Sequence, residues 1–291
     1  MDINVTKGNY VPKHKYLVCI DSDGCAFDTM EIKHKECFCP ATIDTWGLQA
    51  ISKYAREAWE YVNLYSKTRG CSRFHALINV LDLLAERKEV KSRNFRMPDY
   101  ESLHKWVETA PILNNDAVAK LTDDPVMART LEWSYNMNRR VAQMVRDIPP
   151  FPYVRESLER LSQFADIVIV SATPREALLK EWHEHELDQH VALLGAQEDG
   201  SKKEIIGYIK HFYDSNKAIM IGDAPGDQDA AAANGILFYP ICPNEEERSW
   251  QEFYTTVIDL FQKGIYAGNE MQKYLEHFEK ALPSTPPWIN D

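Results

Sequence analysis

The stretch Tyr16-Leu17-Val18-Cys19-Ile20-Asp21-Ser22-Asp23-Gly24-Cys25 decides the fold. Its first five residues are an apolar run of strand length, and two carboxylates, Asp21 and Asp23, follow at the point where that strand would end. In a parallel α/β sheet, the carboxyl ends of the strands open onto the ligand crevice. Carboxylates crowded there repel one another unless a cation or a proton compensates their charge. The stretch therefore predicts a parallel sheet with an acidic, metal-binding site at its edge.

The segments after Pro152 alternate between amphipathic helices and short apolar strands. Helices are predicted over 154–164, 175–185, 203–212 and 228–233, and strands over 166–170, 191–194, 218–221 and 236–239. This alternation predicts a parallel sheet with helices on both faces. Residues 16–20 must join that sheet, because alone they have no strand to pair with. Two further helices are expected at 249–263 and 269–281, followed by an irregular tail over 283–287.

The block between the first strand and the others has a different texture. Apolar residues recur there at three- and four-residue spacing, which predicts helices over 44–66, 73–90, 99–110, 114–121 and 124–146. The proline-rich connector at 148–152 ends the block, because proline fixes φ and lacks a backbone donor. We therefore predict an α/β core domain, residues 1–28 and 149–291, interrupted by an all-helical domain, residues 29–148, with hinges near 28–30 and 149–152.

The composition narrows the class of partner. The 291 residues include 33 Lys and Arg against 44 Asp and Glu, a formal charge of −11, with no basic block. This argues against binding to nucleic acid or to an anionic membrane surface. No secretion signal is visible and no apolar run approaches the roughly 18 residues of a membrane span, so we expect a cytoplasmic protein with reduced cysteines and a small-molecule partner. Nothing in the sequence indicates the oligomeric state.

Four polar clusters follow the predicted strands. They are Asp21 with Asp23, Ser171, the pair Lys202 and Lys203, and the run 222–227 that holds Asp223 and Asp227. In this order, with a helical block after the first cluster, they resemble the four motifs of the haloacid dehalogenase-like (HAD) hydrolase superfamily. The resemblance spans residues 16 to about 240. It implies a Rossmann-like three-layer core, a helical C1-type cap, and a Mg²⁺-dependent phosphatase that acts on a small phosphorylated metabolite through an aspartyl-phosphate intermediate.

The first cluster can be interpreted chemically without the family. A carboxylate needs no deprotonation at neutral pH to act as a nucleophile, and covalent transfer splits hydrolysis into two easier steps. Asp21 is the candidate nucleophile. The leaving oxygen of a phosphate ester needs a proton, which a carboxyl two residues along the same extended chain can donate and later recover from water. Asp23 is therefore the candidate general acid and base.

The other clusters supply charge compensation. Asp21 and Asp223 are predicted to hold Mg²⁺, a hard cation that prefers oxygen ligands, and the resemblance adds the backbone carbonyl of Asp23. Asp227 is expected to act through a water or by orienting a ligand. The phosphoryl oxygens are predicted to bind Ser171, Ala172 and a lysine. Of the two lysines, we favour Lys202 over Lys203, because the apolar pair that follows Lys202 by three and four residues turns that face of the helix inward.

Several other polar groups admit competing interpretations. Arg69 and Arg73, with Lys67 and His75, could contact an anionic substrate, and surface ion pairing is the competing role. Cys25 is interpreted as a buried packing group. A zinc site at His34, Cys37 and Cys39 lacks an obvious fourth ligand and the spacing of a known finger.

Two alternatives to a phosphatase stay open at this stage. A phosphomutase of the same superfamily would share all four clusters. A catalytically silent metal- or phosphate-binding regulatory protein would keep the fold, and its mark would be the loss of a catalytic residue, whereas all of the expected ones are present.

Overall fold

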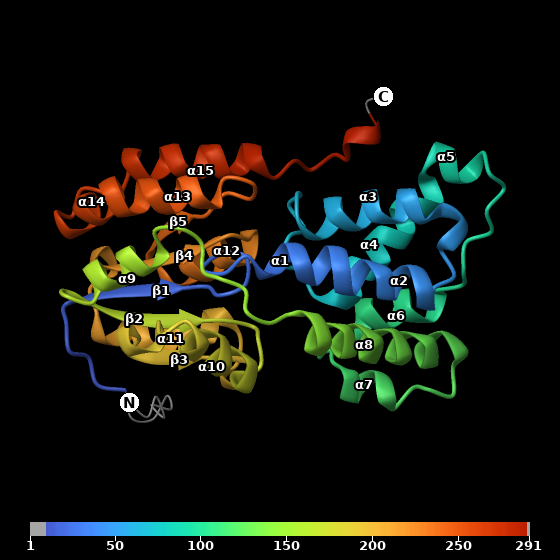
Figure 1. The fold of residues 1–291 in the computed structure, drawn as a ribbon, viewed down its shortest axis with the longest axis horizontal. Coiled ribbons are helices and arrows are strands. Elements are labelled where there is room, and N and C mark those ends of the chain that lie inside the picture. Colours follow the sequence, from blue (N-terminus) through green and yellow to red (C-terminus); the bar gives the residue numbers. More distant parts are fainter. Residues whose placement is uncertain (1–9, 290–291) are drawn as a thin grey trace. The chain divides into compact units, whose positions relative to one another are not determined.

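The computed structural model describes residues 10–289, which form two compact units (Figure 1). One unit holds the described residues up to Thr29 together with Asp147–Leu282, and the other holds Met30–Arg146 and the described residues from Pro283 onward. The chain therefore passes between the units three times. The third passage differs from the predicted division, in which the C-terminal tail was part of the core.

The first unit, hereafter the core unit, is built on one parallel sheet of five strands, as predicted for an α/β fold. The strand order is β3-β2-β1-β4-β5, so the first strand lies in the centre. Leu17 of β1 is opposite Asp166 on one side and Ala218 on the other. The strands are β1 Tyr16–Ile20, β2 Ala165–Val170, β3 Leu193–Gly195, β4 Ala218–Gly222 and β5 Leu237–Pro240.

The two faces of this sheet are buried under different helices. Alternate residues of each strand point to opposite faces, and in β1 Val18 and Ile20 belong to one apolar cluster while Leu17 and Cys19 belong to another. The first cluster is covered by α9 Val154–Leu161, α10 Arg175–Glu184, α13 Glu246–Glu252 and α14 Ile258–Gln262. The second is covered by α11 Lys202–Ile209, α12 Pro225–Asn234 and α15 Asn269–Ala281. The result is the predicted three-layer core.

The second unit, hereafter the helical unit, contains helices and no strands among its described residues, and its helices are shorter than predicted. The predicted helix over 44–66 is interrupted at Gly47, whose φ of +67° is unfavourable for any residue with a side chain. The helix from Arg73 ends at Glu86, because Arg87 is extended. The helices begin with α1 Thr29–Ile32, whose first residue belongs to the core unit, and the π-helical turn Lys33–Phe38. They continue with α2 Cys39–Thr45, the short turn Gln49–Ile51, α3 Ser52–Asn63, α4 Arg73–Glu86, α5 Lys88–Lys91, α6 Glu101–Thr109, α7 Asn115–Ala119 and α8 Pro125–Met144.

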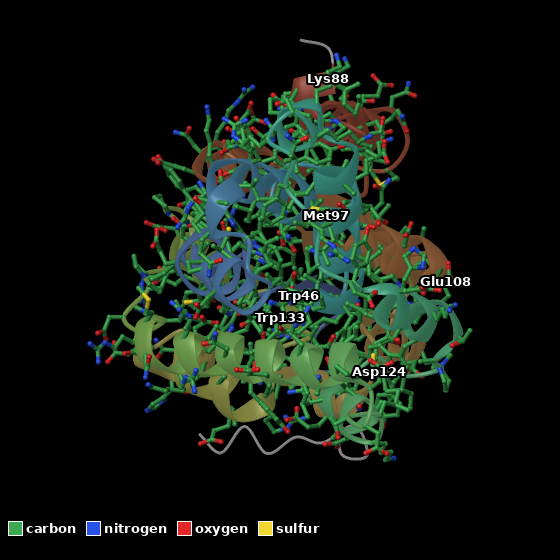
Figure 2. The ribbon with its side chains drawn as sticks, turned by 90° about the vertical axis from the view of Figure 1, so that its right-hand side faces the viewer. Trp46, Lys88, Met97, Glu108, Asp124 and Trp133 are labelled. Atoms are coloured by element: carbon green, nitrogen blue, oxygen red, sulfur yellow. The ribbon has the colours of Figure 1, made fainter. Side chains whose placement is uncertain are left out.

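The helical unit has an apolar interior of its own. Trp46 and Trp133 are almost completely buried, and the indole N–H of Trp133 donates to the Thr42 hydroxyl at 2.9 Å. Figure 2 shows these two tryptophans in the interior of the unit, with Lys88 and Glu108 at its periphery. Within residues 10–289, no helix combines the length and the apolar character needed to cross a membrane.

The C-terminal tail packs onto the helical unit. The guanidinium of the buried Arg87 lies 4.4 Å from the ring centre of Trp288 and 4.6 Å from that of Tyr54, so it is enclosed between two aromatic rings. The Trp288 ring also meets Tyr61 edge to face, and the Tyr61 hydroxyl donates to the carbonyl of Pro283 at 3.4 Å. These contacts attach the described part of the C-terminal tail to the helical unit.

We predict that Trp288→Ala lowers the free energy of unfolding by about 1–3 kcal/mol, since it removes a half-buried ring and a cation–π contact. Urea denaturation followed by circular dichroism measures this. Ile289→Ala is the matched control, because Ile289 is exposed and adjacent. Equal stability of the two variants would show that the tail contacts contribute nothing.

Candidate active site

The loop after β1 turns sharply and presents its polar residues at the end of the sheet. The N–H of Asp21 continues the sheet by donating to the carbonyl of Ile221 at 3.0 Å. The carbonyl of Ser22 then accepts the N–H groups of Cys25, Ala26 and Phe27, and Gly24 adopts a φ of +74° that glycine allows without strain. This compact turn leaves Asp21 buried and Asp23 partly exposed.

Two buried tryptophans hold this loop from the helices beside it. The indole N–H of Trp182 on α10 donates to the Ser22 hydroxyl at 3.0 Å, and that hydroxyl donates to Glu181 at 2.9 Å. The indole N–H of Trp250 on α13 donates to the carbonyl of Cys25 at 2.7 Å. Cys25 itself is fully buried, in agreement with its predicted packing role. Both helices thus fix the loop that carries the two predicted catalytic aspartates.

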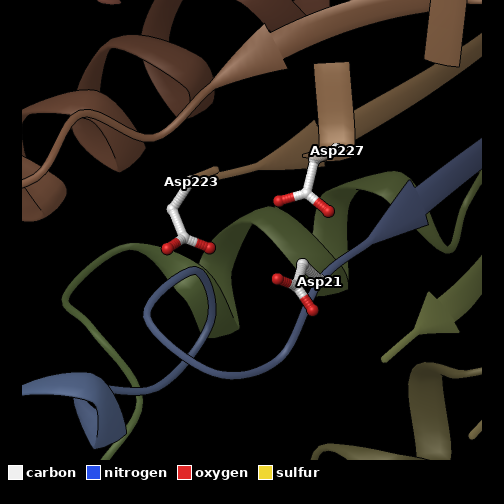
Figure 3. A group of neighbouring side chains, drawn as sticks. All are labelled: Asp21, Asp223 and Asp227. Carbon is white, nitrogen blue, oxygen red and sulfur yellow. The ribbon is translucent and has the colours of Figure 1, made fainter. Parts of the chain in front are cut away.

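Three buried carboxylates meet at the carboxyl ends of β1 and β4. Asp21 follows β1, whereas Asp223 and Asp227 lie in the loop after β4 and in the first turn of α12. One oxygen from each lies within 4.8 Å of the others, and Figure 3 shows the three groups turned toward a common space. The sequence predicted that Asp21 and Asp223 would lie together at this edge of the sheet. Asp227, predicted to act through a water or by orienting a ligand, lies in the same group of buried carboxylates.

The position of Asp227 depends on the glycine that ends β4. A Cβ at Gly222 would lie 2.4 Å from the Cβ of Asp227, so only glycine leaves room for this aspartate. Oδ2 of Asp227 accepts the N–H of Ala224 at 3.1 Å, which caps α12. Its Oδ1 lies 2.6 Å from Nζ of Lys202.

One lysine compensates part of this negative charge. Nζ of Lys202 lies 2.6 Å from Oδ2 of Asp21 and 2.6 Å from Oδ1 of Asp227. Lys202 is the first residue of α11, where Ser201 and Glu204 form a capping box that fixes the start of the helix. Lys203, the alternative in the sequence, is exposed. The geometry therefore brings Lys202, and not Lys203, into the acidic group.

The three aspartates carry more negative charge than Lys202 alone can compensate. Burial raises the pKa of the Asp21 carboxyl well above its usual range, Lys202 lowers it, and Asp227 and Asp223 raise it again. Burial lowers the pKa of Lys202, but the attraction of Asp21 and Asp227 outweighs this and raises it overall. Three carboxylates against one ammonium leave two formal negative charges. A divalent cation with oxygen ligands fits this donor set.

Asp23 is held by two hydroxyl groups. Oδ1 accepts from Thr29 at 2.5 Å, and Oδ2 accepts from Thr173 at 2.8 Å. Sequence reasoning missed both threonines. Thr173 lies two residues beyond Ser171 in the loop after β2. This proximity to a predicted site residue was the one signal in the sequence that could have pointed to Thr173, and it is weak because hydroxyl residues are common in such loops.

Ser171 directly follows β2 and is buried, with its N–H donating to the carbonyl of Gly195 at 2.9 Å. Its Oγ accepts the N–H of Thr173 at 3.1 Å, which leaves the hydroxyl proton available for an acceptor. Ala172 is exposed beside it.

The predicted substrate arginines lie within the helical unit and contact other groups of that unit. Arg69 is buried and donates to the carbonyl of Leu64 at 2.9 Å. Arg73 donates to Ser134 and to Asn138, and its guanidinium lies over the ring of Phe38. His34 accepts from the indole of Trp59. Among the described residues, the three aspartates are the one cluster arranged to hold a metal ion.

No family model and no curated protein matches this sequence. Solved structures do match. A candidate haloacid dehalogenase-like hydrolase from Bacteroides fragilis gives a TM-score of 0.50 at 16% identity, over 81% of this chain and 93% of that one. A candidate phosphoglycolate phosphatase from Lactobacillus delbrueckii subsp. bulgaricus gives a TM-score of 0.49 at 15% identity, over 88% of this chain and 100% of that one. A haloacid dehalogenase-like family hydrolase from Streptococcus pneumoniae gives a TM-score of 0.45 at 16% identity, over 81% of this chain and 90% of that one. At 16% identity, the likeness to the first of these structures, with its TM-score of 0.50, shows a shared fold and no more.

We predict that Gly222→Ala lowers the free energy of unfolding by about 1–3 kcal/mol, because the new methyl group must displace Asp227. Gly226→Ala is the control, since a Cβ there meets nothing within 4 Å. Chemical denaturation of both variants provides the comparison. A Gly222→Ala protein as stable as the Gly226→Ala protein would contradict the close approach of Asp227 to β4.

Proposed function

We propose that this chain, whose fold is that of the haloacid dehalogenase-like hydrolases, is a Mg²⁺-dependent phosphatase that hydrolyses a small phosphorylated metabolite. The observation that carries the proposal is the group of buried carboxylates around the Lys202 ammonium, with Asp23 and Ser171 on neighbouring loops of the same sheet edge. Acid groups, a cation and a hydroxyl donor are the parts that phosphoryl transfer to a carboxylate requires.

The donor set fits Mg²⁺. The carboxylates of Asp21 and Asp223, with the backbone carbonyl of Asp23, would hold the ion, and Asp227 would orient Lys202 through its 2.6 Å contact. When bound, the ion neutralises charge on the nucleophile and on the phosphoryl oxygens. Lys202 supplies a second positive charge at Asp21, and together with the ion it would favour the ionised form of the buried carboxylate, which is the form that attacks.

In the first half of the proposed reaction, a carboxylate oxygen of Asp21 attacks phosphorus and forms an acyl phosphate. The bond between phosphorus and the ester oxygen breaks, and the ester oxygen leaves with its electron pair. Asp23 in its acid form gives that oxygen a proton, so the product leaves as an alcohol. Ser171 and the backbone at Ala172 donate to the phosphoryl oxygens, where negative charge builds up.

In the second half, water attacks the phosphorus of the acyl phosphate. Asp23, now a carboxylate, accepts a proton from that water, and the bond between phosphorus and the Asp21 oxygen breaks. Inorganic phosphate leaves and the Asp21 carboxylate is restored. Asp23 ends the cycle protonated, as it began, so protons and electrons balance over the two halves.

We expect the purified protein with Mg²⁺ to release inorganic phosphate from members of a panel of phosphorylated metabolites. Asp21→Asn should lower this rate by more than about 10³-fold, because an amide is not a nucleophile of comparable strength. Asp229→Asn on the exposed side of α12 is the matched control and should retain full activity. Turnover by Asp21→Asn at the control rate would rule out Asp21 as the nucleophile. An assay for rearranged sugar phosphates on the same panel separates hydrolysis from mutase activity.

We also expect wild-type protein, stripped with a chelator, to bind Mg²⁺ in isothermal titration calorimetry. Asp223→Asn should weaken binding by at least about tenfold, since it removes a charged oxygen ligand. Asp229→Asn should bind as the wild type does. Equal affinity of the two variants for Mg²⁺ would show that the ion does not use Asp223, whatever the phosphatase activity.

A further inference from the structure

Thr173 contacts two of the proposed functional residues at once. Its hydroxyl donates to Oδ2 of Asp23 at 2.8 Å, and its backbone N–H donates to Oγ of Ser171 at 3.1 Å. The first contact joins the loop after β1 to the loop after β2, and these two strands are neighbours in the sheet. One residue therefore bridges the proposed proton donor and the proposed phosphate ligand.

The loop that carries Thr173 is itself held in place. The carbonyl of Thr173 accepts the N–H of Gln197 at 3.1 Å, and the N–H of Ser171 donates to the carbonyl of Gly195. Arg175, two residues further on, donates its backbone N–H to Glu198 and pairs with Asp199. These contacts tie the loop to the segment after β3 on both sides of Thr173. A hydroxyl on so constrained a backbone can orient its partner instead of following it.

A threonine hydroxyl suits a carboxyl group that must both give and take a proton. A hydroxyl donates one hydrogen and accepts others, so it can donate to a carboxylate oxygen or accept from a carboxylic acid. The contact therefore persists in both halves of the proposed reaction. A lysine in the same place could only donate, and it would oppose the acid form by its charge.

We propose that Thr173 is a positioning residue that orients Asp23 toward the leaving oxygen, an inference that rests on the proposed phosphatase activity. Its backbone N–H occupies an acceptor site of Ser171, which turns the serine proton outward. Its hydroxyl, together with that of Thr29 on the other oxygen, sets the direction of the Asp23 carboxyl. Loss of the hydroxyl should therefore impair proton donation and leave phosphate binding by Ser171 intact.

The test compares two substrates that differ in their need for a proton donor. p-Nitrophenyl phosphate releases a weakly basic phenolate and needs little protonation, whereas β-glycerophosphate releases a strongly basic alkoxide. The measured quantity is kcat/KM, because it reports the steps up to departure of the leaving group. The variants are Thr173→Val, which keeps the shape without the hydroxyl, and Thr173→Ser, which keeps the hydroxyl. Asp23→Ala serves as the positive control, and Thr255→Val, at an exposed threonine of the core unit, as the matched negative control.

We expect Thr173→Val to lower kcat/KM for β-glycerophosphate by about 10- to 100-fold, because this loss is part of the usual contribution of general acid catalysis. For p-nitrophenyl phosphate, kcat/KM should fall by no more than about threefold. Thr173→Ser should restore most of the loss. Equal losses on both substrates, or no loss, would overturn the inference while the wild-type rates upheld the phosphatase. A wild type inactive on both substrates and on the metabolite panel would overturn the proposed function and this inference with it. Should Thr173→Val fail to fold, Thr173→Ala gives the same comparison.

Discussion

The structure of the site depends on the placement of one ammonium group among buried carboxylates. Lys202 lies 2.6 Å from both Asp21 and Asp227, and its ammonium compensates part of the negative charge of three buried aspartates. An isolated buried charge costs several kcal/mol, whereas a paired and hydrogen-bonded one costs far less. The lysine thus lowers the cost of burying the acidic cluster, and the negative charge that it leaves uncompensated is the reason for proposing a cation there.

The backbone brings these charges together through the parallel arrangement of the strands. β1 lies between β2 and β4, so the loops after these three strands emerge side by side at one edge. The lysine arrives from the start of α11, where a capping box fixes the first turn. Each charged side chain of the candidate site therefore comes from the residues next to a strand end or from the first turn of a helix, so the spacing between the charges does not depend on long loops.

The sequence indicated the core of this arrangement because local pattern and global fold agree there. Apolar runs of strand length, each followed by polar residues, predicted the sheet, its three layers and the meeting of Asp21 with Asp223. Three features of the structure could not be predicted from the sequence. The break at Gly47 depends on a backbone conformation that a periodic apolar pattern conceals. The contacts of Thr29 and Thr173 with Asp23 depend on side-chain directions at loop ends. The packing of Trp288 beside Arg87 joins residues some two hundred positions apart, where no local signal exists.

The remaining requirement is that a loop carrying two carboxylates, Asp21 and Asp23, must not move away from the lysine. Charge repulsion favours opening of such a loop, and a turn built on one glycine resists it weakly. The indole N–H groups of Trp182 and Trp250 supply the resistance, since each donates to the loop from a fully buried ring. Moving the loop would leave two indole donors unsatisfied in an apolar interior, at about 1–3 kcal/mol each. The apolar packing of α10 and α13 is thereby coupled to the electrostatics of the site, so the core that stabilises the fold also holds the acidic groups in place.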